Sequence, residues 1–561
     1  MAPSPKHIEE YEYKSFDVAK DEPGDVPSTA SPKHLVLIGG GHAHVQVIKA
    51  FSARPRERLQ VTLIDQQYAA SYSGMVPGCI AKLYTPDQTL LHLTPLAQWA
   101  DLKFLHRTVV DVDLDQKLIY TAADSTKPST TTTTKDDGNR HEESAVAEQE
   151  EPIPFDAISI DIGSTTRDLQ HVPGAYEYTI PTRPIADLIR RIEEAEQKVL
   201  SELQMAQQQN RNTATASSSL PQRTIRVVVV GAGVAGLELA MSIQGRWNHA
   251  FDPWKVHVTV VDAVCHHEEI LPSESPACRH KLGQLLEHKG IELRFECGVK
   301  EIRSDRLVFQ TNTNALQFDY CIWATGAGAH NLAYRLQKRG LALDDHGWIQ
   351  VNKCLQSTSH SFVFAAGDCA SHPASPPKAG VFAVRSGPIL IQNLTRYLLS
   401  RGPPVAIMDG QDSSTTSSLD LVEFVPQDDF LKLLACGDGK ALGFRFGIPI
   451  HGKWVWEMKD TIDNTFMDLF KVEKLPTDPE DKKRLFDISQ YDASYACQEH
   501  NNTIDPQLAA QTLRRDDDDV NYKDAWKIIR DMACMAWYRD QVLQQWHATE
   551  EMVLQGTATA P

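Results

Sequence analysis

The sequence lacks any apolar run approaching the eighteen or more consecutive residues that a membrane-spanning helix needs, so no such helix is predicted. Residues 1–33 mix Glu, Asp, Lys and Pro without an apolar core, which predicts disorder and neither a secretory signal nor a transit peptide. Positive charge is also scarce: 56 Lys and Arg against 74 Asp and Glu give a formal net charge of −18. Nucleic acid is therefore not an expected partner, because phosphate binding needs clustered positive charge.

Closely spaced cysteines are also missing. The ten cysteines lie far apart and no two of them form a C-x-x-C pair, which excludes a zinc ribbon and a thioredoxin-type motif. We expect reduced, mostly buried thiols in a cytosol-like compartment. His266 and His267 are neighbours, but adjacent side chains usually point in different directions, so we expect surface histidines and no metal site.

Two glycine-rich turns dominate what is present. An apolar strand at 35–38 runs into Gly-Gly-Gly-His-Ala-His at 39–44, and a second strand at 225–230 runs into Gly-Ala-Gly-Val-Ala-Gly at 231–236. Each turn should lead into a helix and then a second strand, ending at Asp65 or Asp262. Backbone N–H groups at such a turn can hold a pyrophosphate, and the carboxylate can accept a ribose hydroxyl. Two turns in order therefore predict two dinucleotides.

Three further strands end in glycine: 155–163, 320–326 and a strand from 361 that ends in Ala-Gly-Asp at 366–368. The first and third should extend the first strand–helix–strand unit, and the second should close the other unit. Helices are expected at 184–208, which is strongly charged, and at 378–400. The polar segments 122–152, 209–222 and 409–419 are expected to be an inserted disordered loop, a linker and a boundary.

In this order the motifs of residues 34–400 resemble the two-dinucleotide flavoproteins of the pyridine nucleotide–disulfide oxidoreductase superfamily, and within it the type II NADH dehydrogenases. A narrower resemblance, to the flavoprotein module fused to selenophosphate synthetase in some bacteria, rests on short motifs. Those motifs are 39–44, 72–78, 378–385, 437–440, 454–456 and 459–460. No synthetase-like module is present, so that activity is not implied.

The resemblance implies an α/β fold: two Rossmann-like dinucleotide-binding domains, as in glutathione reductase, plus a C-terminal α+β region. The predicted divisions are 1–33 (disordered), 34–185 (first part of the FAD-binding domain), 186–222 (helix and linker), 223–340 (NAD(H)-binding domain), 341–400 (second part of the FAD-binding domain) and 401–561 (C-terminal domain). Length alone favours three to four domains.

The resemblance also assigns site residues. Glu238 should lie near the nicotinamide, Arg183 near the flavin, and Lys378 at the start of a helix whose N-terminus faces the flavin's pyrimidine edge; these three are the catalytic candidates. The cofactor-binding candidates are Gly39, Gly41, His42, Ala43, Asp65, Ser73, Gly74, Met75, Val109, Gly163, Gly231, Gly233, Gly236, Asp262, Gly326, Gly367, Asp368 and Gly380.

Alternatives accompany several of these residues. Asp368 could merely cap a helix, Arg183 could be solvated, and 73–75 could be a plain loop. His44 stands where G-x-G-x-x-G has its third glycine, which serves close helix–strand packing. A bulky residue there implies a wider fit or a side chain turned aside.

The predicted activity is an FAD-dependent NADH dehydrogenase. Disulfide reductases of this family carry a C-x₄-C pair beside the flavin, whereas this chain has only Cys79 there, so electrons should pass directly to an acceptor. A quinone is the acceptor that the resemblance implies. NADPH is less expected than NADH, because the carboxylate of Asp262 would repel a 2′-phosphate.

Two other functions stay open. One is an interaction protein resembling apoptosis-inducing factor and controlled by NADH. The other is a reductase of ferredoxin or a small protein, which the acidic composition disfavours because docking needs a basic face.

The last segment, 521–555, has a helical pattern. Its apolar positions are Trp526, Ile529, Met532, Ala533, Ala536 and Trp537. Acidic residues surround them, whereas helices at a membrane surface usually have basic polar faces. We therefore expect packing or homodimerisation, with peripheral membrane contact as the alternative, and a location in the cytoplasm or peripheral on a membrane.

Overall fold

The computed structural model describes ten ranges: 31–122, 151–212, 222–266, 270–311, 314–399, 421–427, 429–485, 504–515, 520–534 and 539–547. Most of the predicted insert and linker, the polar stretch 409–419 and nearly all of the N-terminal segment lie outside them. The charged helix α5 (Ile185–Asn212) begins as predicted and continues past its predicted end at 208.

The first glycine turn belongs to a five-stranded parallel sheet. Its order is β21 (Val363–Ala365), β9 (Ala157–Ile160), β1 (Lys33–Ile38), β2 (Leu59–Asp65) and β5 (Lys103–His106). All four pairings are parallel, so the carboxyl ends meet at one edge, where the glycine turn lies. The chain returns to this sheet through β21, as the sequence predicts.

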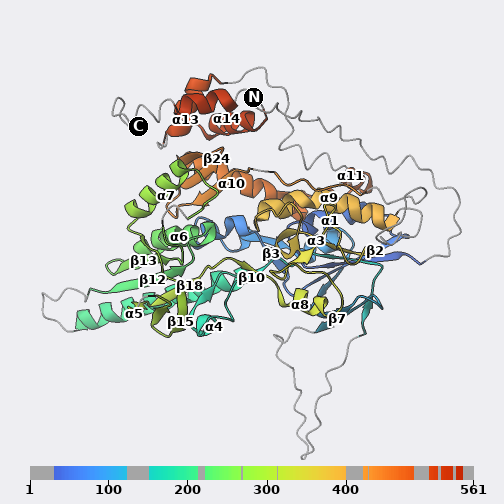
Figure 1. The fold of residues 1–561 in the computed structure, drawn as a ribbon, viewed down its shortest axis with the longest axis horizontal. Coiled ribbons are helices and arrows are strands. Elements are labelled where there is room, and N and C mark those ends of the chain that lie inside the picture. Colours follow the sequence, from blue (N-terminus) through green and yellow to red (C-terminus); the bar gives the residue numbers. More distant parts are fainter. Residues whose placement is uncertain are drawn as a thin grey trace, which may run out of the picture.

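The second glycine turn belongs to a similar sheet, placed beside the first (Figure 1). Its order is β11 (Ile180–Pro181), β18 (Tyr320–Trp323), β12 (Thr224–Val230), β13 (Lys255–Val261) and β14 (Glu292–Arg294). These pairings are also parallel, with β12 in the centre. The predicted α/β fold with two Rossmann-like units is confirmed.

The remaining strands and helices complete the two halves. The strands are β3 (Ala69–Ser71), β4 (Leu90–His92), β6 (Thr108–Asp113), β7 (Leu118–Ala122), β8 (Ile153–Pro154), β10 (Thr165–Thr166), β15 (Val299–Arg303), β16 (Arg306–Phe309), β17 (Leu316–Gln317), β19 (Ala327–Gly328), β20 (Ile349–Gln350) and β22 (Ala370–Ser371). The helices are α1 (His44–Ala50), α2 (Val76–Ile80), α3 (Leu93–Trp99), α4 (Ala175–Tyr178), α6 (Val234–Ala250), α7 (Pro276–His288), α8 (Asn331–Gln337) and α9 (Gly380–Leu399).

The C-terminal part is an antiparallel sheet with helices, and lies along one side of both halves (Figure 1). It comprises β23 (Lys432–Ala435), β24 (Ala441–Arg445), β25 (Ile448–Gly452), α10 (Lys453–Asp468), α11 (Pro479–Arg484), α13 (Pro506–Arg514) and α14 (Tyr522–Cys534). Ile529 and Met532 of α14 are buried in a core shared with α10. Ala536 and Trp537 lie outside the described residues.

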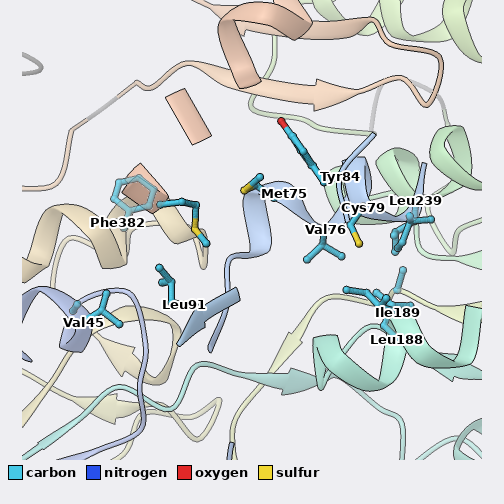
Figure 2. Close-up of a cluster of buried hydrophobic side chains, with 14 of the residues drawn as sticks. Val45, Met75, Val76, Cys79, Tyr84, Leu91, Leu188, Ile189, Leu239 and Phe382 are labelled. Carbon is cyan, nitrogen blue, oxygen red and sulfur yellow. The ribbon is translucent and has the colours of Figure 1, made fainter. Parts of the chain in front are cut away.

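A continuous apolar core joins the halves. Met75, Cys79 and Leu239 are among its buried side chains (Figure 2). Burial raises the pKa of the Cys79 thiol to about 11, so the sulfur is held as a neutral thiol. None of the eight cysteines whose side chains are described is in a disulfide, and six of them are buried. In the described part of the chain, no helix is long and apolar enough to cross a membrane.

Candidate functional site

A large cavity, of about 2690 Å³, lies where the two halves and the C-terminal part meet. Both glycine turns contribute to its wall, through Gly41 and Gly233. Of the predicted site residues, those that line it are Gly41, His42, Asp65, Ser73, Gly74, Gly163, Arg183, Gly233, Glu238, Gly326, Asp368, Lys378 and Gly380.

The first turn is fixed by the neighbouring strands. Gly39 has a φ of +91°, and a Cβ there would stand 2.4 Å from the carbonyl oxygen of Asp161, so only glycine fits. The Gly40 N–H donates to the Asp65 carboxylate at 2.6 Å. Asp65 therefore ties the end of β2 to the middle of the turn.

The second turn repeats this arrangement. Gly231 has a φ of +108°, and a Cβ there would stand 2.4 Å from the Ala324 carbonyl oxygen. The Ala232 N–H donates to the Asp262 carboxylate at 2.6 Å, and the Val264 N–H donates to its other oxygen at 3.1 Å. The two halves thus build the same turn in the same way, with an aspartate after the second strand accepting the N–H of the turn's second residue.

The third position of each turn is filled differently. A Cβ on Gly236 would stand 2.0 Å from the Gly231 carbonyl oxygen, so α6 lies tightly on its turn. In the first turn, the His44 ring occupies this space: Nδ1 donates to the Gly39 carbonyl at 2.6 Å, and Nε2 accepts from the Ser159 hydroxyl at 2.8 Å. Burial lowers the pKa of His44 to about 4, so the ring is neutral. The histidine is turned into the core, away from the cofactor space.

Asp161, which sequence reasoning did not select, fixes the first turn through its carboxylate. Its carboxylate accepts from the N–H groups of Ala43 and His44 at 2.9 and 3.2 Å. A Cβ on Gly41 would stand 2.2 Å from its Cγ, so Gly41 is glycine because of this side chain. Burial raises the pKa of Asp161 to about 7, against the lowering effect of the two N–H groups. Its only sequence signal was its place at the end of a strand.

The turns leave room for cofactors. A Cβ added to Gly163 or Gly233 would meet nothing within 4 Å, and both residues face the cavity. Glycine at these positions keeps backbone exposed to a bound molecule rather than relieving a packing clash. With two such turns on one cavity, the residues present fit two dinucleotides, one at each turn.

The loop around 72–75 forms another part of the wall. Ser73 and Gly74 line the cavity, and a Cβ on Gly380 would stand 3.3 Å from both the Ser73 hydroxyl and the His42 ring. These segments converge although they are far apart in sequence. Met75 differs from its prediction: it is fully buried in the core and does not line the cavity (Figure 2). In the single 3₁₀ turn Ser73–Met75, the first two residues line the cavity and the Met75 side chain packs into the core.

Arg183 and Asp368 meet across the cavity wall. The Arg183 guanidinium lies 3.6 Å from the Asp368 carboxylate, which also accepts from the Ser164 hydroxyl at 2.8 Å. Ser164 directly follows Gly163, so the glycine end of the first sheet and the Ala-Gly-Asp segment are joined by side chains. These contacts, rather than a helix cap, are what the Asp368 carboxylate makes.

Lys378 lines the cavity, but its ammonium is engaged elsewhere. Nζ donates to the Ala370 carbonyl at 2.5 Å and lies 4.4 Å from the centre of the Trp348 ring. The helix predicted to begin at 378 begins at Gly380. The geometry gives Lys378 an anchoring role for the segment before α9, and the predicted catalytic role remains a prediction.

Glu238 lies at the junction of α6 and the C-terminal part. Its carboxylate accepts from the Ala435 N–H at 2.7 Å, and burial raises its pKa to about 7, although Lys459 opposes the rise. Lys459 pairs with Asp463 at 2.8 Å. All three side chains line the cavity. Sequence reasoning assigned no role to Lys459 or Asp463.

The remaining predicted residues do not line the cavity. Most of them lie in or beside the glycine-rich segments and contribute to their backbone geometry: Gly39, Ala43, Gly231, Gly236, Asp262 and Gly367. Val109 lies in β6, at a bulge in the β6–β7 ladder, and is also outside the lining. Nothing in the described structure brings Val109 to the cavity, so its predicted cofactor contact does not follow from the geometry.

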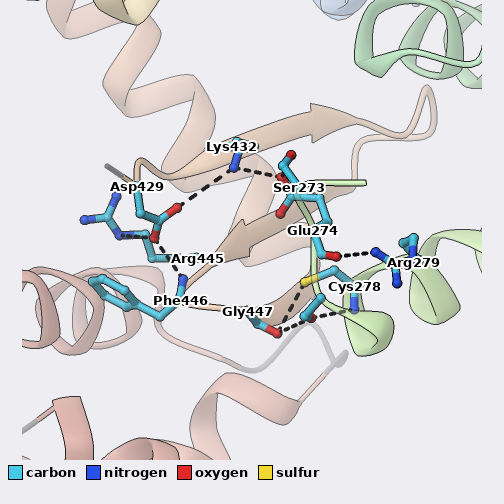
Figure 3. A network of polar contacts seen from close by, with 10 residues as sticks. Ser273, Glu274, Cys278, Arg279, Asp429, Lys432, Arg445, Phe446 and Gly447 are labelled. Carbon is cyan, nitrogen blue, oxygen red and sulfur yellow. Dashed lines mark hydrogen bonds and ion pairs between the residues drawn. The ribbon is translucent and has the colours of Figure 1, made fainter. Parts of the chain in front are cut away.

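A polar network ties the second half to the C-terminal part (Figure 3). Lys432 pairs with Glu274 at 2.8 Å, and Ser275 donates to the Gly447 carbonyl at 2.6 Å. Glu274 and Lys432 also line the cavity. The C-terminal sheet is therefore fastened to the second half beside the cavity.

Comparison with known proteins agrees with this geometry. The family model described as pyridine nucleotide-disulphide oxidoreductase matches residues 33–387. The external NADH-ubiquinone oxidoreductase 2 of Saccharomyces cerevisiae mitochondria is 21% identical over 441 residues, covering 72% of each chain. The demethylphylloquinone reductase of Synechocystis is 26% identical over 222 residues, covering 39% of this chain and 47% of that protein.

Solved structures share the fold. NDH2 from Plasmodium falciparum in complex with NADH superposes with a TM-score of 0.58 and 12% identity, covering 83% of this chain and 98% of that one. The sulfide:quinone oxidoreductase from Aquifex aeolicus also gives 0.58, with 15% identity, covering 78% and 91%. The narrower resemblance, to a module fused to selenophosphate synthetase, has no counterpart among these matches.

Proposed function

Since the chain belongs to the pyridine nucleotide-disulphide oxidoreductase family, we propose that it is an FAD-dependent NADH dehydrogenase that passes two electrons to a quinone. The observation that carries this proposal is the pair of carboxylate-anchored glycine turns on one cavity. Such a cavity holds both dinucleotides at once, so their reactive rings can meet without a carrier.

The cofactors supply the redox chemistry: hydride passes from the nicotinamide to the flavin. The protein's part is positioning and electrostatics. Gly41 and Gly163 would hold the FAD side, and Gly233 the NADH side, with their backbone open to the ligand. Arg183, held by Asp368, places a cation on the wall of the flavin half.

A direct transfer to the acceptor follows from Cys79. Its thiol is buried in the core, and its pKa is raised to about 11, which leaves no thiolate for a dithiol relay. The names of the yeast and Synechocystis relatives support a quinone as acceptor. Support also comes from the cavity wall near α9 and α10, where Ile389, Ile462, Phe466 and Leu469 offer apolar surface to a ring.

NADH is proposed over NADPH because of Asp262. One of its oxygens accepts the Ala232 N–H of the turn and the other accepts the Val264 N–H just after β13, so the carboxylate is fixed beside the second turn. A negative charge there would repel the 2′-phosphate of NADPH. In Asp262→Ala, the ratio of kcat/KM for NADH to that for NADPH should fall at least tenfold. An unchanged ratio in a folded variant would assign the preference to other residues.

The decisive experiment is anaerobic mixing of the purified yellow protein with NADH, followed by a panel of quinones. Bleaching of the flavin by NADH and its reoxidation by quinone are expected. Gly233→Ala is the comparison variant, because it adds a methyl group to the open space at the second turn without a clash. Its flavin should need more NADH for the same bleaching. If NADH leaves the flavin of the folded protein oxidised, the dehydrogenase proposal fails; if only reoxidation fails, the quinone is wrong.

A further inference from the structure

A buried lysine from the C-terminal part reaches the loop that lines the flavin half of the cavity. Lys459 of α10 is 4% exposed, yet it lines the cavity. Its Nζ donates to the Gly74 carbonyl at 2.7 Å and to the Asp463 carboxylate at 2.8 Å. Gly74 and Lys459 are 385 positions apart in the sequence, so the fold alone brings them together.

The ammonium stays charged although it is buried. Burial alone lowers the pKa of Lys459, but the carboxylates of Asp463 and Glu238 more than offset this, and the pKa lies above its ordinary value. Asp463 is one helical turn away on α10, and Glu238 faces Lys459 from α6. A fixed positive charge therefore sits among these carboxylates, at the backbone of the 73–74 segment.

The Gly74 loop is held closely in this position. A Cβ on Gly74 would stand 3.1 Å from the Tyr72 ring and 3.3 Å from the Asp463 carboxylate. The pair with Asp463 lies within α10 and by itself would not bring the ammonium to the loop. The hydrogen bond to the Gly74 carbonyl places the charge of Lys459 at the cavity wall.

We propose that Lys459 is an electrostatic positioning residue that raises the reduction potential of the flavin. The inference rests on the proposed function, because it assigns the flavin to the first turn and the 73–74 segment. A hydride brings two electrons and one proton, so the flavin gains one negative charge when it accepts hydride from NADH. A fixed cation in a low-dielectric cavity stabilises that charge. Without Lys459, Asp463 would leave a net negative charge at the same place.

The test is the flavin potential of the full-length, FAD-loaded protein, measured by equilibration with a reference dye under slow chemical reduction. Lys459→Met should shift the equilibrium constant at least tenfold toward oxidised flavin, which is about 30 mV for a two-electron couple. Lys459→Arg, which keeps the charge, should stay near the wild-type value. Lys453→Met is the matched control, because Lys453 lies on the same helix with an exposed side chain.

The outcomes separate cleanly. A folded, flavin-loaded Lys459→Met with the wild-type potential overturns the proposal. If that variant loses its flavin, Lys459→Gln, which can still donate to the Gly74 carbonyl, decides by the same criterion. The dye measurement needs no NADH. If Lys459→Met shifts the flavin potential as expected but NADH does not reduce the wild-type flavin, the dehydrogenase function is rejected and the role of Lys459 stands. A protein that binds no flavin would reject both.

Discussion

His44 and Gly236 make the same contact in opposite ways. Each faces the carbonyl of the first glycine of its turn; Gly236 does so by having no side chain, and His44 by donating a hydrogen bond. The arrangement at His44 needs a neutral ring, and it needs the Ser159 hydroxyl to donate to the ring's Nε2. One turn is therefore sensitive to volume, and the other to protonation.

The volume-sensitive turn predicts contrasting effects for two alanine substitutions. Gly236→Ala drives a Cβ into the Gly231 carbonyl oxygen, so we expect a loss of about 1–3 kcal/mol in the free energy of unfolding. Gly233→Ala meets no protein atom within 4 Å, so stability should change by less than about 0.5 kcal/mol while the KM for NADH rises. Denaturant titration and steady-state kinetics distinguish the two. Equal stability losses would contradict the assignment.

The protonation-sensitive turn predicts a pH dependence. The pKa of His44 is lowered from 6.5 to about 4 by burial, so below pH 6.5 the unfolded chain takes up a proton that the folded ring refuses. The stability that the neutral ring contributes is complete above pH 6.5 and is lost toward pH 4, at up to about 1.4 kcal/mol per pH unit. The stability difference between wild type and His44→Gln, measured by urea titration, should therefore shrink from pH 7 to pH 5. A constant difference would show that the ring is not buried neutral.

At the scale of elements, three helices are joined by buried charge. Arg246 of α6 bonds the Glu196 carboxylate of α5 and donates to the Ile80 carbonyl of α2 at 2.9 Å. Lys82 also pairs with Glu196, at 2.6 Å. The Arg246 and Glu196 side chains are only 4% and 1% exposed. This network holds together helices from both halves of the molecule.

Breaking that network should be costly. Arg246→Met leaves the Glu196 carboxylate buried with Lys82 as its one charged partner, so the free energy of unfolding should fall by about 3–5 kcal/mol. Arg190→Met is the matched control on α5: its pairs with Glu194 and Asp187 are exposed, and no measurable change is expected. Chemical denaturation of both variants checks the contrast. A mild effect of Arg246→Met would mean that Lys82 and water compensate.

The elements were largely predictable from the sequence because their signals are local. Apolar strands ending in glycine and an acidic residue mark β1, β2, β12 and β13, and the structure has them within a residue or two. Met75 and Val109 do not line the cavity, for a reason that local signals do not carry. A resemblance transfers a segment of chain, whereas the direction of a side chain depends on the turn or bulge that carries it.

At the scale of the whole molecule, the site is made by contacts that no local pattern encodes. Asp161 supports a turn that lies 118 positions away from it in sequence, and Lys459 reaches a loop 385 positions away. Neither contact is marked in the sequence, although Asp161 itself lies in a strand that ends in glycine. Their positions depend on how the first sheet closes and how α10 docks on it, and both are known only once the three parts are assembled.

The hydrogen bond from Lys459 to Gly74 has a consequence for assembly. In the proposed function, docking of α10 and binding of the flavin act on the same loop, so each would change the equilibrium of the other by an equal free energy. A bound cofactor would then favour docking of the C-terminal part, and the docked C-terminal part would tighten cofactor binding. The C-terminal part and a cofactor bound at the first turn would therefore stabilise each other.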